Sequence, residues 1–302
     1  MRYLDPRADL TFKRIFGEHK ELIKNFLNAL LPLKEGDEIE DLEFLPAEQA
    51  PDSPMREDSI VNVRCWDKYR RPFFVEIQIY LTHFYRLRVL FNDSKVYVRQ
   101  SKKSVDYAYQ QPLYSLNLIN FAFLPDSEDF YHYYDIVNVE HSDKVIDGLH
   151  FVFVELPKFK PQSISGRKMA VLWLRFLTEL NAGTDTVPED FLENPYLKQA
   201  VQILDRYSYN ERDLYTYEKY WDWVGYELAL FNDAYKKGVQ LGIEEARKQA
   251  LEEAKKQGFE EGKNLGAKES LVAIVRKMKS MGLSNEKIAK VTNLTIDDIE
   301  NL

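Results

Sequence analysis

The segment DSIVNVRCWDKYRRPFFVEIQIY, residues 58–80, decides the fold because it contains two strands and the turn between them. Residues 59–66 and 72–80 are rich in β-branched and aromatic side chains, which favours a strand pair. Strand alternation gives the second strand one apolar face, made of Phe73, Val75, Ile77 and Ile79. Glu76 and Gln78 then lie on the opposite face, and the usual antiparallel register predicts that Asn62 faces the same way.

The elements around this strand pair indicate a mixed α/β sheet flanked by helices. The opening residues 5–32 have helical spacing, with Asp9 as the expected N-cap, an interruption at Gly17 and an end at Pro32. A helix over about 82–103 follows the pair, then strands at 114–124 and 150–157 with another expected between them. A strand pair, a helix and further strands are typical of this fold class.

The C-terminal third is all-helical in pattern. Over residues 238–271, Glu–Glu pairs precede Lys or Arg, and glycines recur at multiples of four. This pattern is consistent with close helix–helix approach or with an extended solvated helix. The end of the chain predicts a helix, a turn at Gly282, and helices capped by Ser284 and Thr295, which resembles a small helix-turn-helix used for packing, dimerisation or DNA reading.

Three regions follow from this reading. We expect a core over residues 1–160, a helical layer over 161–232, and a long helix with a small helix-turn-helix-like end over 233–302.

Composition limits the class of protein. The net charge of −8 argues against a protein coated in nucleic acid, although screening allows a local basic site. The single cysteine, Cys65, excludes an internal disulfide framework. No segment resembles a signal peptide, and no apolar run approaches the ~18 residues of a membrane helix. We therefore expect a cytoplasmic protein without a membrane partner.

An acid in a strand that is otherwise apolar needs a physical reason, because a buried charge is costly unless it is paired or bound to a metal. Carboxylate and amide oxygens from Glu76, Asn62 and Gln78 would suit Mg²⁺ or Mn²⁺, which could activate water against a phosphodiester. The alternatives are an exposed edge Glu76 and an ordinary hydrogen-bonded Asn62. His83 is expected to be structural, and Cys65 has no neighbours that indicate a nucleophile.

The order and spacing of several motifs resemble a known family. DLTFKRIFG, DSIVNVRCWD, FFVEIQIY, RLRVLFNDSKVYVRQ, VELPKF, WLRFL and the glycine-rich tail resemble the recombination-promoting nuclease and transposase family of the PD-(D/E)XK nuclease superfamily. The resemblance implies a restriction-endonuclease-like α/β core with an all-helical C-terminal extension. It also implies Mg²⁺- or Mn²⁺-dependent cleavage of double-stranded DNA.

The resemblance assigns the site residues and shows one position, Asn62, that differs from the family pattern. The catalytic positions would be Glu76, Gln78, Asn62 and Asp9, with Glu76 and Asn62 as metal ligands and Lys13 as a further candidate. Gln78 is expected, because the family has Glu-x-Gln where most of the superfamily has Lys. Asn62 replaces the Asp of the family, and a neutral amide lacks the negative charge that holds a divalent ion, so the departure implies a weakened or inactive site.

Local charge favours DNA binding beside this site. Residues 64–103 contain ten Lys or Arg and three acids. The predicted DNA contacts are Arg64, Arg86, Arg88, Lys95, Arg99 and Gln100, the last matching a family glutamine. The alternative is that these charges solvate one helix face.

Three functions remain open on these observations. The first is a metal-dependent DNA endonuclease linked to recombination or transposition, weakened at Asn62. The second is a DNA-binding descendant that no longer cleaves, and the third is a protein-interaction factor built on the C-terminal helices. Cutting both strands of DNA requires two sites, which suggests a homodimer.

Overall fold

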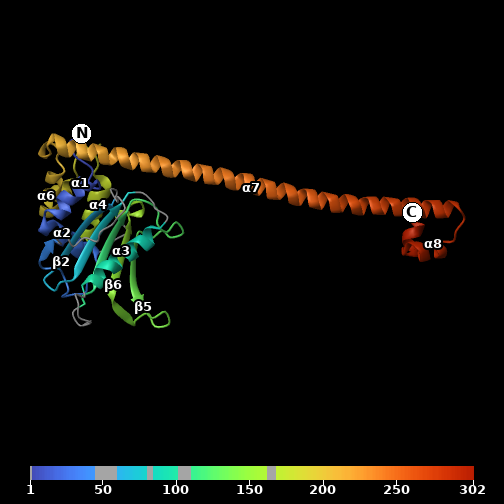
Figure 1. Cartoon of the computed structure of the whole chain (residues 1–302), viewed down its shortest axis with the longest axis horizontal. Coiled ribbons are helices and arrows are strands. Elements are labelled where there is room, and N and C mark those ends of the chain that lie inside the picture. Colours follow the sequence, from blue (N-terminus) through green and yellow to red (C-terminus); the bar gives the residue numbers. More distant parts are fainter. Residues whose placement is uncertain (1, 45–59, 80–83, 101–109, 162–167) are drawn as a thin grey trace. The chain divides into compact units, whose positions relative to one another are not determined.

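The structure is a computed structural model that describes residues 2–44, 60–79, 84–100, 110–161 and 168–302, without the side chains of residues 60–62 (Figure 1). It divides into two compact units, residues 1–228 and 229–302. Each unit is described separately below.

Six strands in the described residues of the first unit form one sheet, in the order β1-β2-β3-β4-β6-β5 (Figure 1). Their bounds are β1 Leu42–Phe44, β2 Ile60–Asp67, β3 Pro72–Gln78, β4 Leu113–Ile119, β5 Tyr131–Val137 and β6 Val145–Glu155. β3 is antiparallel to β2 and parallel to β4, and β6 is parallel to β4 and antiparallel to β5. The predicted fold class, a mixed sheet flanked by helices, is confirmed.

Helices precede, interrupt and follow the strands. In the described residues they are α1 Asp9–Phe12, the π-helix η1 Lys13–Gly17, α2 Lys20–Leu30, α3 Tyr85–Arg99, the 3₁₀ turn η4 Leu156–Lys158, α4 Lys168–Glu179, α5 Glu189–Glu193, α6 Pro195–Ile203, the 3₁₀ turn η6 Arg206–Ser208, α7 Glu211–Ser280, α8 Asn285–Thr292 and α9 Ile296–Glu300. The predicted interruption at Gly17 is confirmed, because η1 ends there. The predicted N-cap is wrong: Ala8, whose backbone is extended, caps α1, and Asp9 is its first helical residue.

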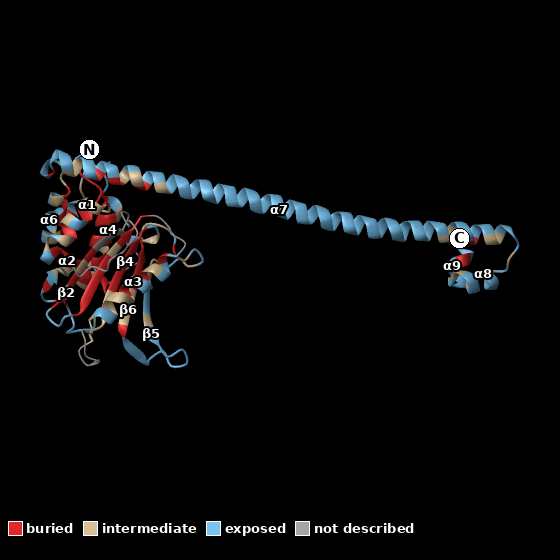
Figure 2. Ribbon diagram, viewed as in Figure 1, coloured by how far each residue is buried: buried red, intermediate tan, exposed pale blue. Residues whose placement is uncertain are grey.

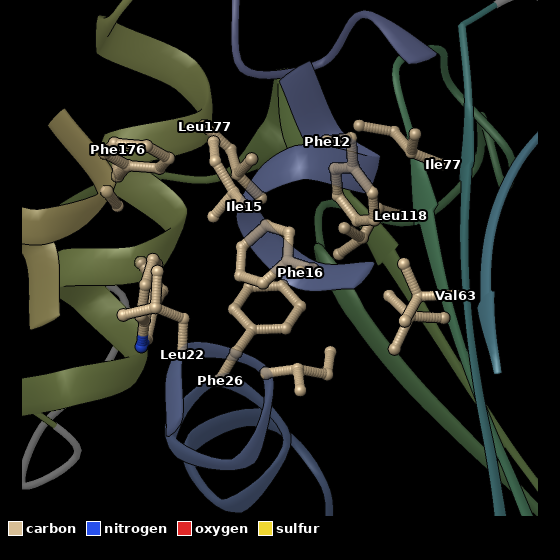
Figure 3. Packing of buried hydrophobic residues seen from close by; sticks show 14 of the residues in the cluster. Phe12, Ile15, Phe16, Leu22, Phe26, Val63, Ile77, Leu118, Phe176 and Leu177 are labelled. Atoms are coloured by element: carbon tan, nitrogen blue, oxygen red, sulfur yellow. The ribbon is translucent and has the colours of Figure 1, made fainter. Parts of the chain in front are cut away.

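The main core lies on one face of the sheet. Inward residues of β2 and β3, such as Val63 and Ile77, belong to one buried cluster with Phe12 of α1, Phe16 of η1 and helix α4 (Figure 3). Figure 2 shows this buried region in red across the sheet and the helices beside it. Side chains of α4 and α6, which come after residue 160, belong to the same buried cluster as side chains from residues 1–160. The predicted domain boundary at residue 160 stays a prediction.

Helix α3 covers the opposite face of the sheet. Its residues Tyr85 and Val89 are buried against Ile119 of β4 and Phe153 of β6. A side chain of β3 that alternates away from the main core therefore points toward α3.

The second unit consists of residues 229–280 of α7 and two short helices. Val275, Ile288 and Ile299 form its small core. Gly282 has φ +80°, which confirms the predicted turn, and Thr295 caps α9 through a reciprocal pair of hydrogen bonds with Asp298. Ser284 is the N-cap residue of α8 but makes no side-chain cap bond.

Helix α7 is exposed over most of its length (Figure 2). Apart from the adjacent residues and the backbone of the helix itself, no heavy atom of the described chain lies within 4 Å of a Cβ added at any of its glycines from Gly238 to Gly266. Within the described chain these glycines therefore do not mediate close helix–helix approach. Among the described residues, no helix combines the length and the apolar character needed to cross a bilayer.

The aromatic centre of the main core gives a stability prediction. Phe16 is fully buried and contacts Phe12, Phe26 and Trp173 at ring-centroid distances of 4.7, 4.5 and 5.4 Å. Phe16→Ala should lower the free energy of unfolding by about 3–5 kcal/mol, because it leaves a cavity. Urea unfolding followed by tryptophan fluorescence measures this, since all four tryptophans lie in residues 1–228.

The matched control is Tyr207→Ala, an aromatic truncation at a side chain that is 91% exposed. It should change the unfolding free energy by less than about 0.5 kcal/mol. Equal losses in the two variants would contradict the position of Phe16 in the core.

Candidate functional site

The β2–β3 register brings the predicted strand residues together. Asn62 is paired directly with Glu76, and Ile60 with Gln78. Directly paired residues lie on the same face of a sheet, so the predicted common face of Asn62, Glu76 and Gln78 agrees with the backbone. The side chain of Asn62 lies outside the described part of the structure.

Glu76 and Gln78 are joined by an arginine from α3. Arg88 Nη2 donates to Glu76 Oε1 at 2.8 Å and to Gln78 Oε1 at 2.8 Å. The side chains of Glu76 and Arg88 are only 14% and 21% exposed, and Gln78 is 1% exposed. The acid in the buried strand is therefore neutralised by a charge-assisted hydrogen bond from the helix that covers it.

Helix α3 aims Arg88 at the sheet because of its own packing. Tyr85, one helical turn before Arg88, and Val89, directly after it, are both buried. The guanidinium carbon of Arg88 lies 5.2 Å from the centre of the Tyr85 ring. The Arg88 stem is thus held between the helix and β3, with the charged end at the acid.

Further polar groups that sequence reasoning missed are buried under the same helix. Tyr85 Oη donates to Asn117 Oδ1 at 3.2 Å, and Asn117 Nδ2 donates to Ser115 Oγ at 3.0 Å. Asn117 is paired with Glu76 in the parallel register of β3 and β4. The available signal was the alternation of Ser115 and Asn117 within the apolar strand LYSLNLI.

Asp93, one turn beyond Val89 on α3, is a second buried carboxyl in this layer. It is 6% exposed, and its Oδ2 has no hydrogen-bond partner among the described residues. Burial, reinforced by the negative charge of Glu76, raises the pKa of Asp93 to about 7, against lowering contributions from Ser115, Arg64 and Arg88. The signal for Asp93 was its spacing of four and eight residues from Val89 and Tyr85 on the inward side of α3.

The described donors do not fit a divalent cation in this arrangement. The described residues contain no group of three or more His, Cys, Asp or Glu side chains that could hold a metal ion. Glu76 is already bonded to a guanidinium, and the residue paired with it is an amide rather than a carboxylate. Mg²⁺ and Mn²⁺ normally require anionic oxygen ligands, so the metal role of Glu76 and Asn62 stays a prediction.

In the described residues the side chain of Asp9 contacts the further candidate Lys13, and it makes no hydrogen bond or ion pair with Glu76 or Gln78. Asp9 Oδ1 pairs with Lys13 Nζ at 2.6 Å. Phe12 of the same helix packs in the main core with Ile77 (Figure 3), and strand alternation places Glu76 on the face opposite to Ile77. The catalytic assignment of Asp9 and Lys13 gains no support from these contacts.

The predicted DNA contacts fall into two groups. Arg86 and Arg99 are exposed on α3, and Lys95 is half-buried; Arg86 and Lys95 rest on the rings of Phe123 and Phe91 at 5.3 and 3.9 Å. Arg64 lies over the Phe74 ring at 5.2 Å, and Arg88 faces Glu76. The DNA-contact assignment of all five stays a prediction.

Other members of the basic stretch have protein partners. Lys68 pairs with Glu40, Arg70 with Glu43, and the buried Arg71 with Asp67. Gln100 exchanges two hydrogen bonds of 3.0 Å with the backbone of Gln111, which ties the end of α3 to the approach to β4. Lys102, Lys103, Tyr107 and Tyr109 lie outside the described residues.

Two further residues were considered as candidates from the sequence, Cys65 and His83. Cys65 is a free, buried cysteine, and burial raises the pKa of its thiol. That is opposite to the shift an activated nucleophile needs. His83 lies outside the described residues.

The buried Asp93 predicts a pH dependence of stability. Its pKa in the folded state, about 7, lies above its ordinary value of 3.8, so the folded chain holds a proton that the unfolded chain loses between these values. Stability therefore falls as pH rises through this window, by up to about 1.4 kcal/mol per pH unit for one proton. Asp93→Asn removes the titration, so its melting temperature should gain on wild type progressively from pH 5 to about pH 7 and then level off.

Thermal unfolding at several pH values measures the difference. Asp126→Asn removes an exposed carboxyl instead and should shift the melting temperature little at any pH. A difference between Asp93→Asn and wild type that does not change with pH would contradict the burial of a titrating Asp93.

Comparison with known proteins identifies the family. No curated protein and no solved structure gave a significant match. Residues 6–224 match the family described as PD-(D/E)XK nuclease family transposase, which covers more than half of the chain and the whole six-stranded sheet. With the restriction-endonuclease-like α/β arrangement and the Glu-x-Gln strand already in place, the chain belongs to the PD-(D/E)XK nuclease family transposases.

Proposed function

We propose that this chain acts on double-stranded DNA as a nuclease of its family, in recombination or transposition, and that its cleavage is weakened at the β2–β3 strand pair. One observation carries the proposal: the register sets the amide residue Asn62 opposite Glu76, and Arg88 already neutralises that acid. Cleavage assisted by a divalent ion depends on anionic oxygens that hold the ion at the scissile phosphate. One carboxylate bonded to an arginine holds such an ion poorly.

Three cations of α3 support DNA as the substrate. Arg86, Lys95 and Arg99 lie on the helix that covers the Glu76 face of the sheet, and the structure gives none of them an acidic partner among the described residues. Cations in such positions can contact phosphates next to the site. Leu87, Leu90 and Phe91 are exposed on the same helix, so this surface is apolar as well as basic.

A second candidate function is DNA binding without cleavage. It is favoured by the bond from Arg88, which places a permanent positive charge on the acid that cleavage would need. The two candidates share the DNA surface and differ in whether the native site cuts. The homodimer, and a protein-interaction role for α7 to α9, remain proposals without a supporting contact.

Restoring the missing carboxylate separates these functions. Asn62→Asp should raise plasmid nicking in Mn²⁺ by about tenfold or more, because a second anionic ligand strengthens ion binding by at least about 1.4 kcal/mol. Glu76→Ala should abolish nicking in both backgrounds. Weak nicking by the wild type supports the first candidate, and none by the wild type with gain in Asn62→Asp supports the second.

Failure of every variant to nick, including Asn62→Asp, would contradict the nuclease proposal. The assay is run with supercoiled plasmid in Mg²⁺ and in Mn²⁺, and EDTA serves as the control for metal dependence.

The DNA surface can be tested independently of cleavage. Lys95→Ala and Arg99→Ala should each weaken binding to duplex DNA and reduce the slope of log K against log salt by about 0.9 for each lost phosphate contact. Lys68→Ala is the matched control, because Glu40 already neutralises Lys68. Fluorescence anisotropy at several salt concentrations measures the slopes, and equal slopes for all four proteins would exclude α3 from the DNA surface.

A further inference from the structure

Arg88 contributes the positive charge nearest to the acid of the candidate site, and it comes from α3 rather than from β3. Its Nη2 atom is 2.8 Å from both Glu76 Oε1 and Gln78 Oε1. A Glu-x-Lys strand carries its positive charge two residues after the acid, whereas here that position is the neutral Gln78. The charge is therefore delivered across the layer by the covering helix.

We propose that Arg88 is the resident cation of this site and competes with divalent metal ions for Glu76. This inference rests on the proposed function, because it takes Glu76 as the acid of a nuclease site, and it adds how that site is controlled. A metal ion would have to displace the guanidinium from Glu76 before it could bind there.

The contacts of Arg88 favour one fixed conformation of its side chain. The side chains of Glu76 and Arg88 are mostly shielded from water, so their attraction is screened less than that of an exposed pair. Gln78, which is fully buried, accepts from the same nitrogen. Tyr85 lies against the guanidinium and is itself buried under α3.

The charges around Glu76 also favour competition. A divalent cation and a guanidinium at one carboxylate repel each other, so the two cannot share Glu76 without a cost. The residue paired with Glu76 in β2 is an amide, which adds no negative charge to offset that repulsion. Release of Arg88 would remove this competing positive charge from Glu76.

Titration of the full-length chain with Mn²⁺, followed by electron paramagnetic resonance of the free ion, tests this proposal without DNA or cleavage. Arg88→Gln should bind Mn²⁺ about tenfold more tightly than wild type, which corresponds to one lost charge-assisted competitor. The double variant Arg88→Gln with Glu76→Gln should lose this gain. Arg86→Gln, a neighbouring arginine of α3 over Phe123 with greater exposure, is the matched control and should bind as wild type does.

Circular dichroism and thermal melting establish that each variant is folded. Should Arg88→Gln fail to fold, Arg88→Met replaces it as the uncharged variant, and Arg88→Lys serves as the control that keeps the charge with a different geometry. Arg88→Lys keeps a positive charge at Glu76 and should bind Mn²⁺ as weakly as wild type, whereas Arg88→Met, which keeps an apolar stem without the charge, should bind the ion more tightly.

The proposal is overturned when the folded variant, Arg88→Gln or its replacement, binds Mn²⁺ no more tightly than wild type, or when Arg86→Gln gains as much. It is also overturned when the gain survives Glu76→Gln. These outcomes are independent of the nicking assay: absence of nicking in Asn62→Asp defeats the proposed function, whereas the Mn²⁺ titration still reports whether Arg88 and the ion compete for Glu76.

Discussion

The structure depends on how a central strand that is covered on both faces accommodates a carboxylate. β3 lies between β2 and β4, with the main core on one side and α3 on the other. Alternation sends Ile77 into the core and Glu76 toward α3, where an unpaired charge would be costly. Arg88 resolves this conflict through the bond to Glu76, and the packing of Tyr85 and Val89 against the sheet sets the side of α3 from which Arg88 reaches the acid. The electrostatics of the candidate site follow from that arrangement.

The site therefore combines a nuclease scaffold with an unusual charge balance. The chain belongs to a nuclease family, and Glu76 and Gln78 lie on β3, the strand that the sequence resemblance predicts to carry the chemistry. Asn62 removes one negative charge from the position opposite Glu76, and Arg88 adds a positive one beside it. Both changes act in the same direction, away from holding a divalent cation. The buried Asp93 brings a carboxyl into the same layer, and its raised pKa keeps it partly protonated near neutral pH.

The sequence was sufficient for the strand pair because its pattern is local. The period-two alternation from Phe73 to Ile79 predicted the common face of Asn62, Glu76 and Gln78 once the usual antiparallel register was assumed. The structure supplies the register itself, in which Asn62 is paired with Glu76. The helices near the start of the chain and the turn at Gly282 were also predicted, because their sequence patterns are local as well. The Asp9 cap was wrong because Ala8 has the extended backbone of the N-cap position, and a preferred residue type did not decide which residue occupies it.

The sequence was insufficient where contacts join distant elements. Arg88 looked like one more cation in a basic stretch, and only the packing of α3 on the sheet reveals that it faces Glu76. Asp93, Ser115 and Asn117 come from different elements, so no local pattern groups them. Charge counting was also misleading for Lys68, Arg70 and Arg71, because acids distant or near in sequence neutralise them in the fold.

A double-mutant cycle on Glu76 and Arg88 tests the central claim most directly. Unfolding free energies are measured for wild type, Glu76→Gln, Arg88→Gln and the double variant, with tryptophan fluorescence as the probe. A charge-assisted bond in this shielded position predicts a coupling energy of about 1.5–3 kcal/mol. A coupling energy within about 0.3 kcal/mol of zero, as for independent sites, would contradict the bond on which the site is built.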